Sequence, residues 1–146
     1  PQYFPHFSSC NRNFLITKEK TATLWCGECA KCAFSFAMLA AFLPKEQVLG
    51  IFGQNLFAKE SLLQTYKELW GVAEIKPFDC VGTPEEVIVA FHLAQQKGSY
   101  NDDAIMQYFQ TEVLPTVTDV QAEEEAVFTN ASEHSIPKEF EEVIQL

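Results

Sequence analysis

The chain has 146 residues, of which 47% are hydrophobic, and its 20 acidic and 10 basic side chains give a net charge of -10. This length and apolar content suit one folded domain and exclude a disordered tail, and the negative charge disfavours a nucleic-acid or anionic-membrane surface. The longest apolar run, residues 33–43, is too short to cross a bilayer, which takes about twenty residues. We therefore expect a cytoplasmic protein in a reducing compartment.

The charge is distributed unevenly along the chain. Residues 118–146 contain eight acidic side chains and one lysine, so they carry -7, and residues 1–117 carry the remaining -3. Such a concentration of one charge resists burial in a core. We predict a folded domain over residues 1–117 and a solvated acidic C-terminal appendage over residues 118–146.

The first third of the chain has a turn followed by two short apolar segments. Cys10 lies among short polar residues that favour turns. Residues 15–17 and 21–25 then flank a charged tip, which is the pattern of a small two-stranded β-ribbon. The second arm of this predicted ribbon leads directly into a cluster of cysteines.

Cys26, Cys29 and Cys32 follow one another at intervals of three residues, and Cys10 precedes them. Thiols at this spacing can converge on one point, where they bind a soft or borderline cation. Gly27 suits the sharp turn between the first two, because glycine tolerates positive φ. The pattern predicts a knuckle in which Cys10, Cys26, Cys29 and Cys32 hold a structural zinc ion. Four thiolates leave the ion no open position for water.

Other interpretations of the cysteines remain open at this point. An iron–sulfur cluster also uses Cys-x2-Cys-x2-Cys, although no Cys-Pro follows Cys32 closely. A disulfide would leave an odd thiol in the cluster, and no secretory signal is visible. His6, four residues before Cys10, could replace one thiol as a ligand. Metal analysis of the purified protein distinguishes zinc from iron.

The rest of the chain has helical periodicity punctuated by Gly and Pro, which makes the fold class mainly α. The predicted helices cover residues 30–43, 45–52, 59–70, 85–97, 101–112, 119–128 and 137–144. Thr83 is a predicted cap with Pro84 in the first turn, and residues 101–103 are predicted to cap the next helix. The helix at 33–43 is apolar all round, so either the other helices bury it or part of it faces a partner or a missing domain.

The fifth cysteine, Cys80, precedes the helix at 85–97. The positive end of that helix could favour a reactive thiolate, although a buried cysteine that packs as a small hydrophobe is the simpler interpretation. No Walker sequence, dinucleotide fingerprint or Ser-His-Asp pattern is present. The residues alone therefore do not identify an activity.

Several blocks of the sequence resemble the C-terminal region of the UDP-N-acetylmuramoyl-L-alanyl-L-glutamate epimerase family, MurL. The likeness covers roughly residues 1–98. Its blocks are Ser9-Cys10-Asn11-Arg12-Asn13-Phe14, Trp25-Cys26-Gly27-Glu28-Cys29-Ala30-Lys31-Cys32-Ala33-Phe34, Phe42-Leu43-Pro44, Ile51-Phe52-Gly53-Gln54-Asn55-Leu56 and Lys76-Pro77-Phe78-Asp79-Cys80-Val81-Gly82. A wider similarity extends to 7-cyano-7-deazaguanine synthases, which pair one upstream cysteine with Cys-Gly-x-Cys-x-x-Cys beside an ATP-pyrophosphatase domain.

The resemblance implies the C-terminal part of an α/β PP-loop ATP pyrophosphatase-type enzyme. The family's ATP-gripping Ser-Gly-Gly-x-Asp-Ser loop is absent from this sequence, so ATP and Mg are expected on a missing N-terminal domain, which would be a partner of this one. The implied reaction is ATP-dependent inversion of the terminal L-Glu of UDP-MurNAc-L-Ala-L-Glu in bacterial peptidoglycan precursor synthesis, through an acyl-adenylate with release of AMP and diphosphate.

The same resemblance suggests roles for individual residues. Cys80, with Asp79 second, is the candidate base that removes the α proton, and Arg12 and Lys31 are candidates for holding substrate phosphate or carboxylate groups. Two other functions remain open. The chain could be a non-enzymatic zinc-stapled interaction module, or part of a tRNA- or deazapurine-modifying enzyme, against which the net charge argues.

Overall fold

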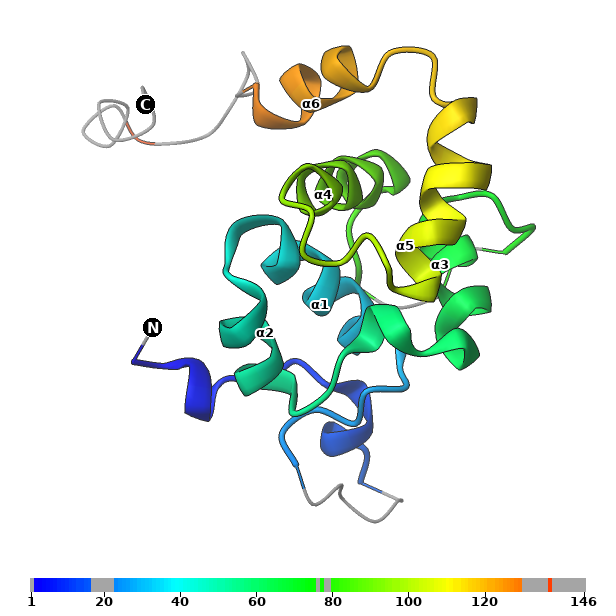
Figure 1. Cartoon of the computed structure of the whole chain (residues 1–146). Coiled ribbons are helices and arrows are strands. Elements are labelled where there is room, and N and C mark those ends of the chain that lie inside the picture. The colour runs from blue at the N-terminus through cyan, green and yellow to red at the C-terminus, as the bar shows by residue number, and fades with distance from the viewer. Residues whose placement is uncertain (1, 17–22, 76, 78–79, 130–136, 138–146) are drawn as a thin grey trace.

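The computed structural model describes residues 2–16, 23–75, 77, 80–129 and 137, and over these ranges it is helical with no strand (Figure 1). The mainly α prediction is therefore confirmed. The longer helices are α1 (Ala30–Phe42), α2 (Lys45–Phe52), α3 (Leu63–Leu69), α4 (Pro84–Gln96), α5 (Ala104–Tyr108) and α6 (Val120–Phe128). Short 3-10 helices include η2 (Asn11–Phe14), η3 (Leu56–Ala58) and η4 (Glu60–Leu62), and a π-helix, η5 (Phe109–Val113), continues α5.

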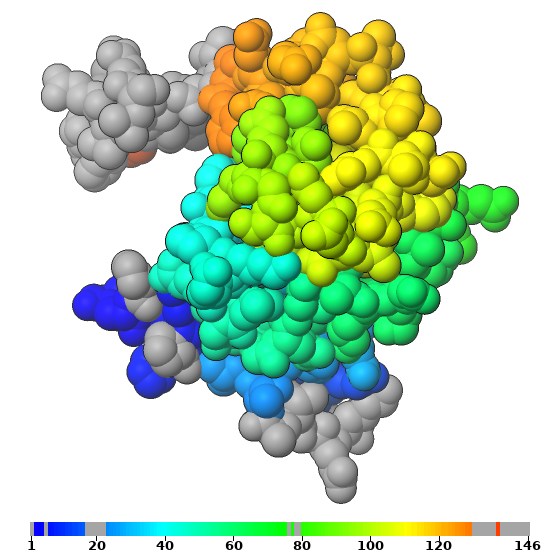
Figure 2. All heavy atoms as spheres, in the orientation of Figure 1, coloured from blue at the N-terminus to red at the C-terminus, as the bar shows by residue number. Residues whose placement is uncertain are grey.

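Helix α1 lies in the middle of the molecule and contacts α2, α3 and α4 (Figure 1). Helix α6 packs against α4, so α4 lies between α1 and α6. The N-terminal segment and the cysteine-bearing turn lie at the opposite end of the molecule from α6, as the space-filling view also shows (Figure 2). One end is thus a cysteine knuckle and the other is a stack of helices.

The apolar α1 is covered mainly by the chain's own helices. Its fully or nearly fully buried residues are Ala30, Cys32, Ala33, Phe36, Ala37, Ala40 and Ala41. The alanines allow neighbouring helices to approach closely, because they add little bulk to the interface. Phe34 and Met38 are only half-buried, and Phe42 is 62% exposed. The other helices of the chain therefore bury most of α1, and its most exposed side chain lies at its C-terminal end.

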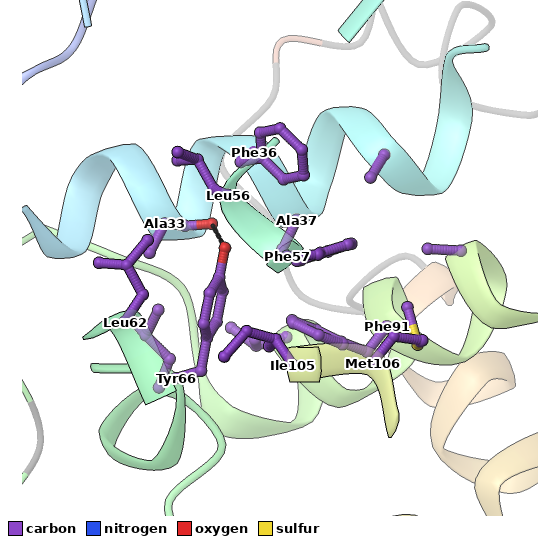
Figure 3. Close-up of a cluster of buried hydrophobic side chains, with 14 of the residues drawn as sticks. Ala33, Phe36, Ala37, Leu56, Phe57, Leu62, Tyr66, Phe91, Ile105 and Met106 are labelled. Carbon is purple, nitrogen blue, oxygen red and sulfur yellow. Dashed lines mark hydrogen bonds between the residues drawn. The ribbon is translucent and has the colours of Figure 1, made fainter. Parts of the chain in front are cut away.

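The core is built from aromatic rings around Phe57 (Figure 3). The Phe57 ring lies 4.6 Å from Phe91 and 4.9 Å from Phe36, and also contacts Tyr66 and Tyr100. Tilted and edge-on pairs at these separations add attraction between the rings to the burial of their surface. Helices α1 and α4 and the η3 segment are thereby fixed together.

Two long side chains attach other elements to the backbone of α1. The hydroxyl of Tyr66 in α3 donates to the Ala33 carbonyl at 3.3 Å (Figure 3), and burial raises the pKa of this phenol. Lys97, at the end of α4, donates from Nζ to the carbonyls of Ala40 (3.1 Å) and Leu43. A cation suits the negative end of a helix, where the carbonyls lack helical partners.

Several predicted helix ends are confirmed. Helix α2 has the predicted bounds and ends at Gly53, which has φ of 70° in the left-handed region. Thr83 caps α4 in a reciprocal capping box with Glu86, and Pro84 occupies the first turn. Asp119 caps α6 through a bond from the Ala122 amide. The predicted helix at 137–144 lies outside the described residues, apart from Pro137.

Three local predictions are wrong in part. The segment 59–70 begins as 3-10 helix η4 before α3. Asp103 makes no side-chain cap on α5, because its carboxylate accepts bonds from Asn55 (2.8 Å) and Lys45 (3.3 Å). Cys80 is exposed, so it is not a buried packing residue.

The predicted β-ribbon is also wrong where the structure describes it. Neither residues 15–16 nor residues 23–25 are in a strand. The Asn13 side chain donates to the carbonyls of Thr23 (2.9 Å) and Leu24 (2.7 Å), so a side chain links the segments. Residues 17–22 of the predicted ribbon lie outside the described ranges.

The acidic segment begins with helix α6, which contributes no buried residue although it contacts α4. The division of the chain at residue 117 stays a prediction. Among the helices that the structure describes, none combines the length and apolar character that crossing a membrane requires.

Candidate metal centre

Four cysteines, three of them close in sequence and Cys10 sixteen residues before the first, meet at one end of the molecule. The Sγ atoms of Cys10, Cys26, Cys29 and Cys32 all lie within 4.8 Å of one another. Cys10 immediately precedes η2, and Cys29 is the N-cap of α1, whose first turn contains Cys32. The prediction that these four thiols converge is therefore confirmed.

The local backbone explains why they converge. Gly27 has φ of 66°, which a side chain would strain, and this turn reverses the chain between Cys26 and Cys29. The Ala33 amide donates to the Cys29 carbonyl at 3.1 Å, which begins α1 at the second cysteine of the turn. Cys29 and Cys32, three residues apart at the start of a helix, therefore lie on one face.

The distances fit a tetrahedral ion and do not fit a disulfide. The Sγ atom of Cys32 is 3.6 Å from that of Cys26 and 3.4 Å from that of Cys29. Zinc–sulfur bonds of about 2.3 Å in a tetrahedron put the sulfurs roughly 3.8 Å apart. A disulfide bond is only about 2.05 Å long. The donor set therefore fits a thiolate-preferring metal after small adjustments.

Backbone amides also favour negative sulfur at this site. The Cys26 amide donates to Cys10 Sγ, and the Glu28 amide donates to Cys26 Sγ, each at 3.4 Å. Hydrogen bonds to a charged form stabilise it, and metal sites depend on such outer contacts. The knuckle thus directs donors at its own sulfurs.

The thiols cannot all ionise without a cation. The hydrogen bond between the Cys29 and Cys32 sulfurs lowers the pKa of the Cys29 thiol to about 4, and the same bond, together with burial, raises the pKa of Cys32. Burial also raises the pKa of Cys26. Neighbouring like charges oppose one another, and a divalent cation at the centre would remove that opposition.

The structure separates Cys80 and His6 from this cluster. Cys80 is exposed in the loop before α4 and is not part of the four-cysteine group, and Asp79 lies outside the described residues. His6 is exposed and is also not in the group. The cysteine cluster and the candidate base are thus different sites.

Arg12 and Lys31 lie beside the cysteines in sequence. Arg12 forms an ion pair with Glu28 across the knuckle, and that carboxylate raises the pKa of the guanidinium. Both side chains are about half exposed, so the pair contributes little stability. Lys31 is partly exposed in the first turn of α1.

Sequence reasoning missed the residues that support the knuckle from outside. Lys59 Nζ donates to the Gly27 carbonyl at 2.9 Å and to Gln54 Oε1 at 3.2 Å. Trp25, which is 1% exposed, packs its ring 4.6 Å from that of Phe52. The nearest signal was the block at 51–56 in the resemblance, which carries Phe52 and Gln54 but indicates no contact with the knuckle.

A second feature is an apolar cavity of about 220 Å³ at the other end of the molecule. It lies between α1, α4 and α6. The lining includes Phe34, Met38, Val89, Leu93 and Phe128. It explains why Phe34 and Met38 are only half-buried.

Together these features define a small helical domain organised around a four-cysteine centre of the kind that binds a metal ion. The family model of the MurL C-terminal domain matches residues 6–125, and the chain belongs to that family.

Three relatives bear the same name, UDP-N-acetyl-alpha-D-muramoyl-L-alanyl-L-glutamate epimerase. The protein of Xanthomonas oryzae pv. oryzae is 36% identical over 93% of this chain and 30% of its own length. The protein of Micromonospora sp. is 37% identical over 89% of this chain and 28% of its own length. The protein of Salinispora tropica is 33% identical over 94% of this chain and 29% of its own length. The chain therefore spans about 30% of the length of these curated relatives. No solved structure matches it significantly.

Proposed function

We propose that this chain is the C-terminal domain of a bacterial, cytoplasmic, ATP-dependent epimerase that converts UDP-MurNAc-L-Ala-L-Glu into UDP-MurNAc-L-Ala-D-Glu for peptidoglycan synthesis. The observation that carries the proposal is the identity of 33–37% along nearly the whole chain to relatives named for that epimerisation. The match covers about 30% of each relative, and in this proposal the complete activity would need the longer protein. Its remaining part would be an α/β PP-loop domain that binds ATP and Mg.

The chemistry requires activation before the proton moves. The α proton beside an ordinary carboxylate is weakly acidic. Transfer of AMP from ATP to the terminal carboxylate, with release of diphosphate, gives an acyl-adenylate whose α carbon can lose its proton to a base. Return of a proton to the opposite face inverts the centre. Hydrolysis by water then releases AMP and restores the carboxylate.

We assign the base to the loop before α4. Cys80 is exposed there, and Thr83 and Glu86 fix the start of the following helix through their capping box. An accessible thiol can exchange a proton with a substrate, which a packed one cannot. Asp79 is the second candidate. Lys31, and Arg12 if it releases Glu28, would hold anionic groups of the substrate.

The metal has a structural role in this proposal. Cys10, Cys26, Cys29 and Cys32 would bind zinc through four sulfurs, and a zinc ion with four thiolate ligands has no open position at which to activate water. The ion would fix the turn that begins α1. Substrate chemistry would occur elsewhere.

The test uses the full-length protein that contains this chain, supplied with UDP-MurNAc-L-Ala-L-Glu, ATP and Mg²⁺ in D₂O. We expect D-Glu by chiral chromatography after hydrolysis, deuterium at its α carbon, and AMP release that depends on the substrate. An enzyme with intact ATP binding that incorporates no deuterium and makes no D-Glu contradicts the proposal.

Cys80→Ser tests the assigned base separately, with Thr111→Ser as a control at an exposed position of η5. We expect Cys80→Ser to lower both deuterium incorporation and D-Glu formation by at least about a hundredfold, which is within the usual contribution of a general base. Undiminished epimerisation by Cys80→Ser rejects Cys80 and leaves the epimerase proposal intact.

A further inference from the structure

The segment that follows α2 lies against the cysteine knuckle. Gly53 ends α2 in the left-handed conformation, and the chain then passes through Gln54 and η3 to Lys59. Lys59 Nζ donates to the Gly27 carbonyl at 2.9 Å and to Gln54 Oε1 at 3.2 Å. Lys59 thus bonds Gly27 directly, and Gln54 bonds Lys59.

We propose that Lys59 and Gln54 are positioning residues of the metal centre, which hold the Cys26–Cys29 turn closed and offset the charge of the metal-bound thiolates. This inference rests on the proposed zinc centre. Four thiolates with one Zn²⁺ carry a net charge of about -2. An ammonium group bonded to a carbonyl inside the turn lowers the cost of that charge.

The Gln54 side chain lies directly against Gly27. A Cβ atom at position 27 would displace the Gln54 side-chain amide. The requirement for glycine comes from its positive φ, and the absence of a side chain there also lets Gln54 approach. This packing aligns Gln54 Oε1 as a second acceptor for Lys59, so the ammonium group is fixed between two oxygens.

The segment is itself anchored to the helical core. Asn55 accepts a bond from the Phe57 amide at 3.1 Å and donates to Asp103 at 2.8 Å, and Asp103 also binds Lys45 at 3.3 Å. Phe57 is fully buried. The backbone that carries Lys59 is thus fixed, so only the freedom of the lysine side chain itself is lost when it binds the knuckle.

The experiment measures metal affinity and does not depend on enzyme activity. Zn²⁺ affinity is obtained by competition with a chromophoric chelator, and the absorption spectrum of the Co²⁺ form reports tetrahedral thiolate geometry. Lys59→Met removes both the charge and the donor. Lys67→Met is the matched control, because Lys67 Nζ lies over the Tyr108 ring at 4.6 Å and touches another part of the molecule.

We expect Lys59→Met to weaken Zn²⁺ binding by about tenfold or more, the usual effect of removing an outer partner of a metal ligand, while Lys67→Met leaves it unchanged. Equal Zn²⁺ affinity for Lys59→Met and the unaltered chain overturns the inference. If the unaltered chain binds neither Zn²⁺ nor Co²⁺, the proposed metal centre itself fails, and this inference fails with it.

A conservative variant keeps the test decisive if Lys59→Met does not fold. Lys59→Gln retains a donor and removes the charge, and its rate of Zn²⁺ release to excess chelator can be compared with that of Lys59→Arg, which retains both. We expect faster release from Lys59→Gln than from Lys59→Arg. Equal release rates from these two variants and the unaltered chain overturn the inference.

Discussion

The two ends of this molecule are stabilised by different interactions. The helical end has a continuous core in which Phe57, Phe91 and Trp70 pack ring against ring. The knuckle end buries Cys10 and Trp25, while Phe14 and Ile16 beside it are 70% and 100% exposed. Burial of apolar surface stabilises the first region. At the second region Trp25 and the buried cysteines join the same core through Phe52, and four converging sulfurs with a few side-chain bonds hold the rest. The stability of the knuckle should therefore depend on its ion.

Removing the metal gives the largest expected effect. Structural zinc contributes about 10–16 kcal/mol in zinc-finger peptides, so chelation should unfold the knuckle while the helical end persists. The two tryptophans report the two regions, because Trp25 lies at the knuckle and Trp70 in the helical core. Fluorescence of Trp70→Phe, which retains Trp25, should change on chelation, whereas that of Trp25→Phe should change little. Equal fluorescence changes in the two variants on chelation would contradict the claim that only the knuckle end depends on the metal.

Phe57→Ala should have the next largest effect, this time at the helical end. Removing a buried phenylalanine costs about 3–5 kcal/mol, because its contacts are lost and a cavity remains. The free energy of unfolding of the metal-loaded chain, from urea titration followed by circular dichroism, measures that cost. The Zn²⁺ affinity of the fraction that is still folded should stay within a few-fold of that of the unaltered chain. A loss of less than about 1 kcal/mol would show that Phe57 is not central to the core.

Thr83→Ala should lower stability by about 1 kcal/mol, since it removes the acceptor of the Glu86 amide at the start of α4. Thr83→Ser retains the hydroxyl and serves as the control. Thermal unfolding of the two variants against the unaltered chain measures the difference. Equal melting temperatures for Thr83→Ala and Thr83→Ser would show that the cap contributes nothing.

Lys97→Met should have the smallest effect, about 0.3–1 kcal/mol, because the lysine that caps the C-terminal carbonyls of α1 is itself exposed. Lys97→Arg keeps the charge, so its free energy of unfolding should fall less than that of Lys97→Met. The same urea titration distinguishes the two variants. The loss for Lys97→Met should shrink at high salt, and a loss independent of salt would indicate packing of the alkyl stem.

Local signals in the sequence predicted much of this architecture. The spacing of the cysteines, Gly53 after α2 and Thr-Pro before α4 each act within a few residues, and the structure confirms all three. Two of the predictions that were wrong, the Asp103 cap and the ribbon, met competing contacts from other parts of the chain. Asp103 has the composition of a helix cap, yet Lys45 and Asn55, both about fifty residues away, bind its carboxylate. A linear pattern carries no sign of such competition.

At the candidate site, too, features set by local sequence could be predicted, and features set by contacts between distant residues could not. The four candidate ligands are identifiable because thiols at that spacing have few other structural uses. Lys59 is an ordinary lysine in the sequence, and only the fold brings it to Gly27, 32 residues away. Asn13 likewise takes the Thr23 and Leu24 carbonyls that a ribbon would have used, and nothing in the alternation of residues indicated that.

Helix α1 belongs to both ends of the molecule, since Cys29 caps it, Cys32 lies in its first turn and Phe36 is in the aromatic core. Its amide protons should therefore exchange with deuterated solvent in two groups. Those that bond the carbonyls at the start of the helix, beginning with the Ala33 amide on Cys29, would become accessible whenever the ion leaves, at a rate that falls as free Zn²⁺ rises. The amides beyond Phe36 would exchange only when the helical end opens, at a rate that does not depend on the metal concentration. One continuous helix would thus record two separate opening events along its length.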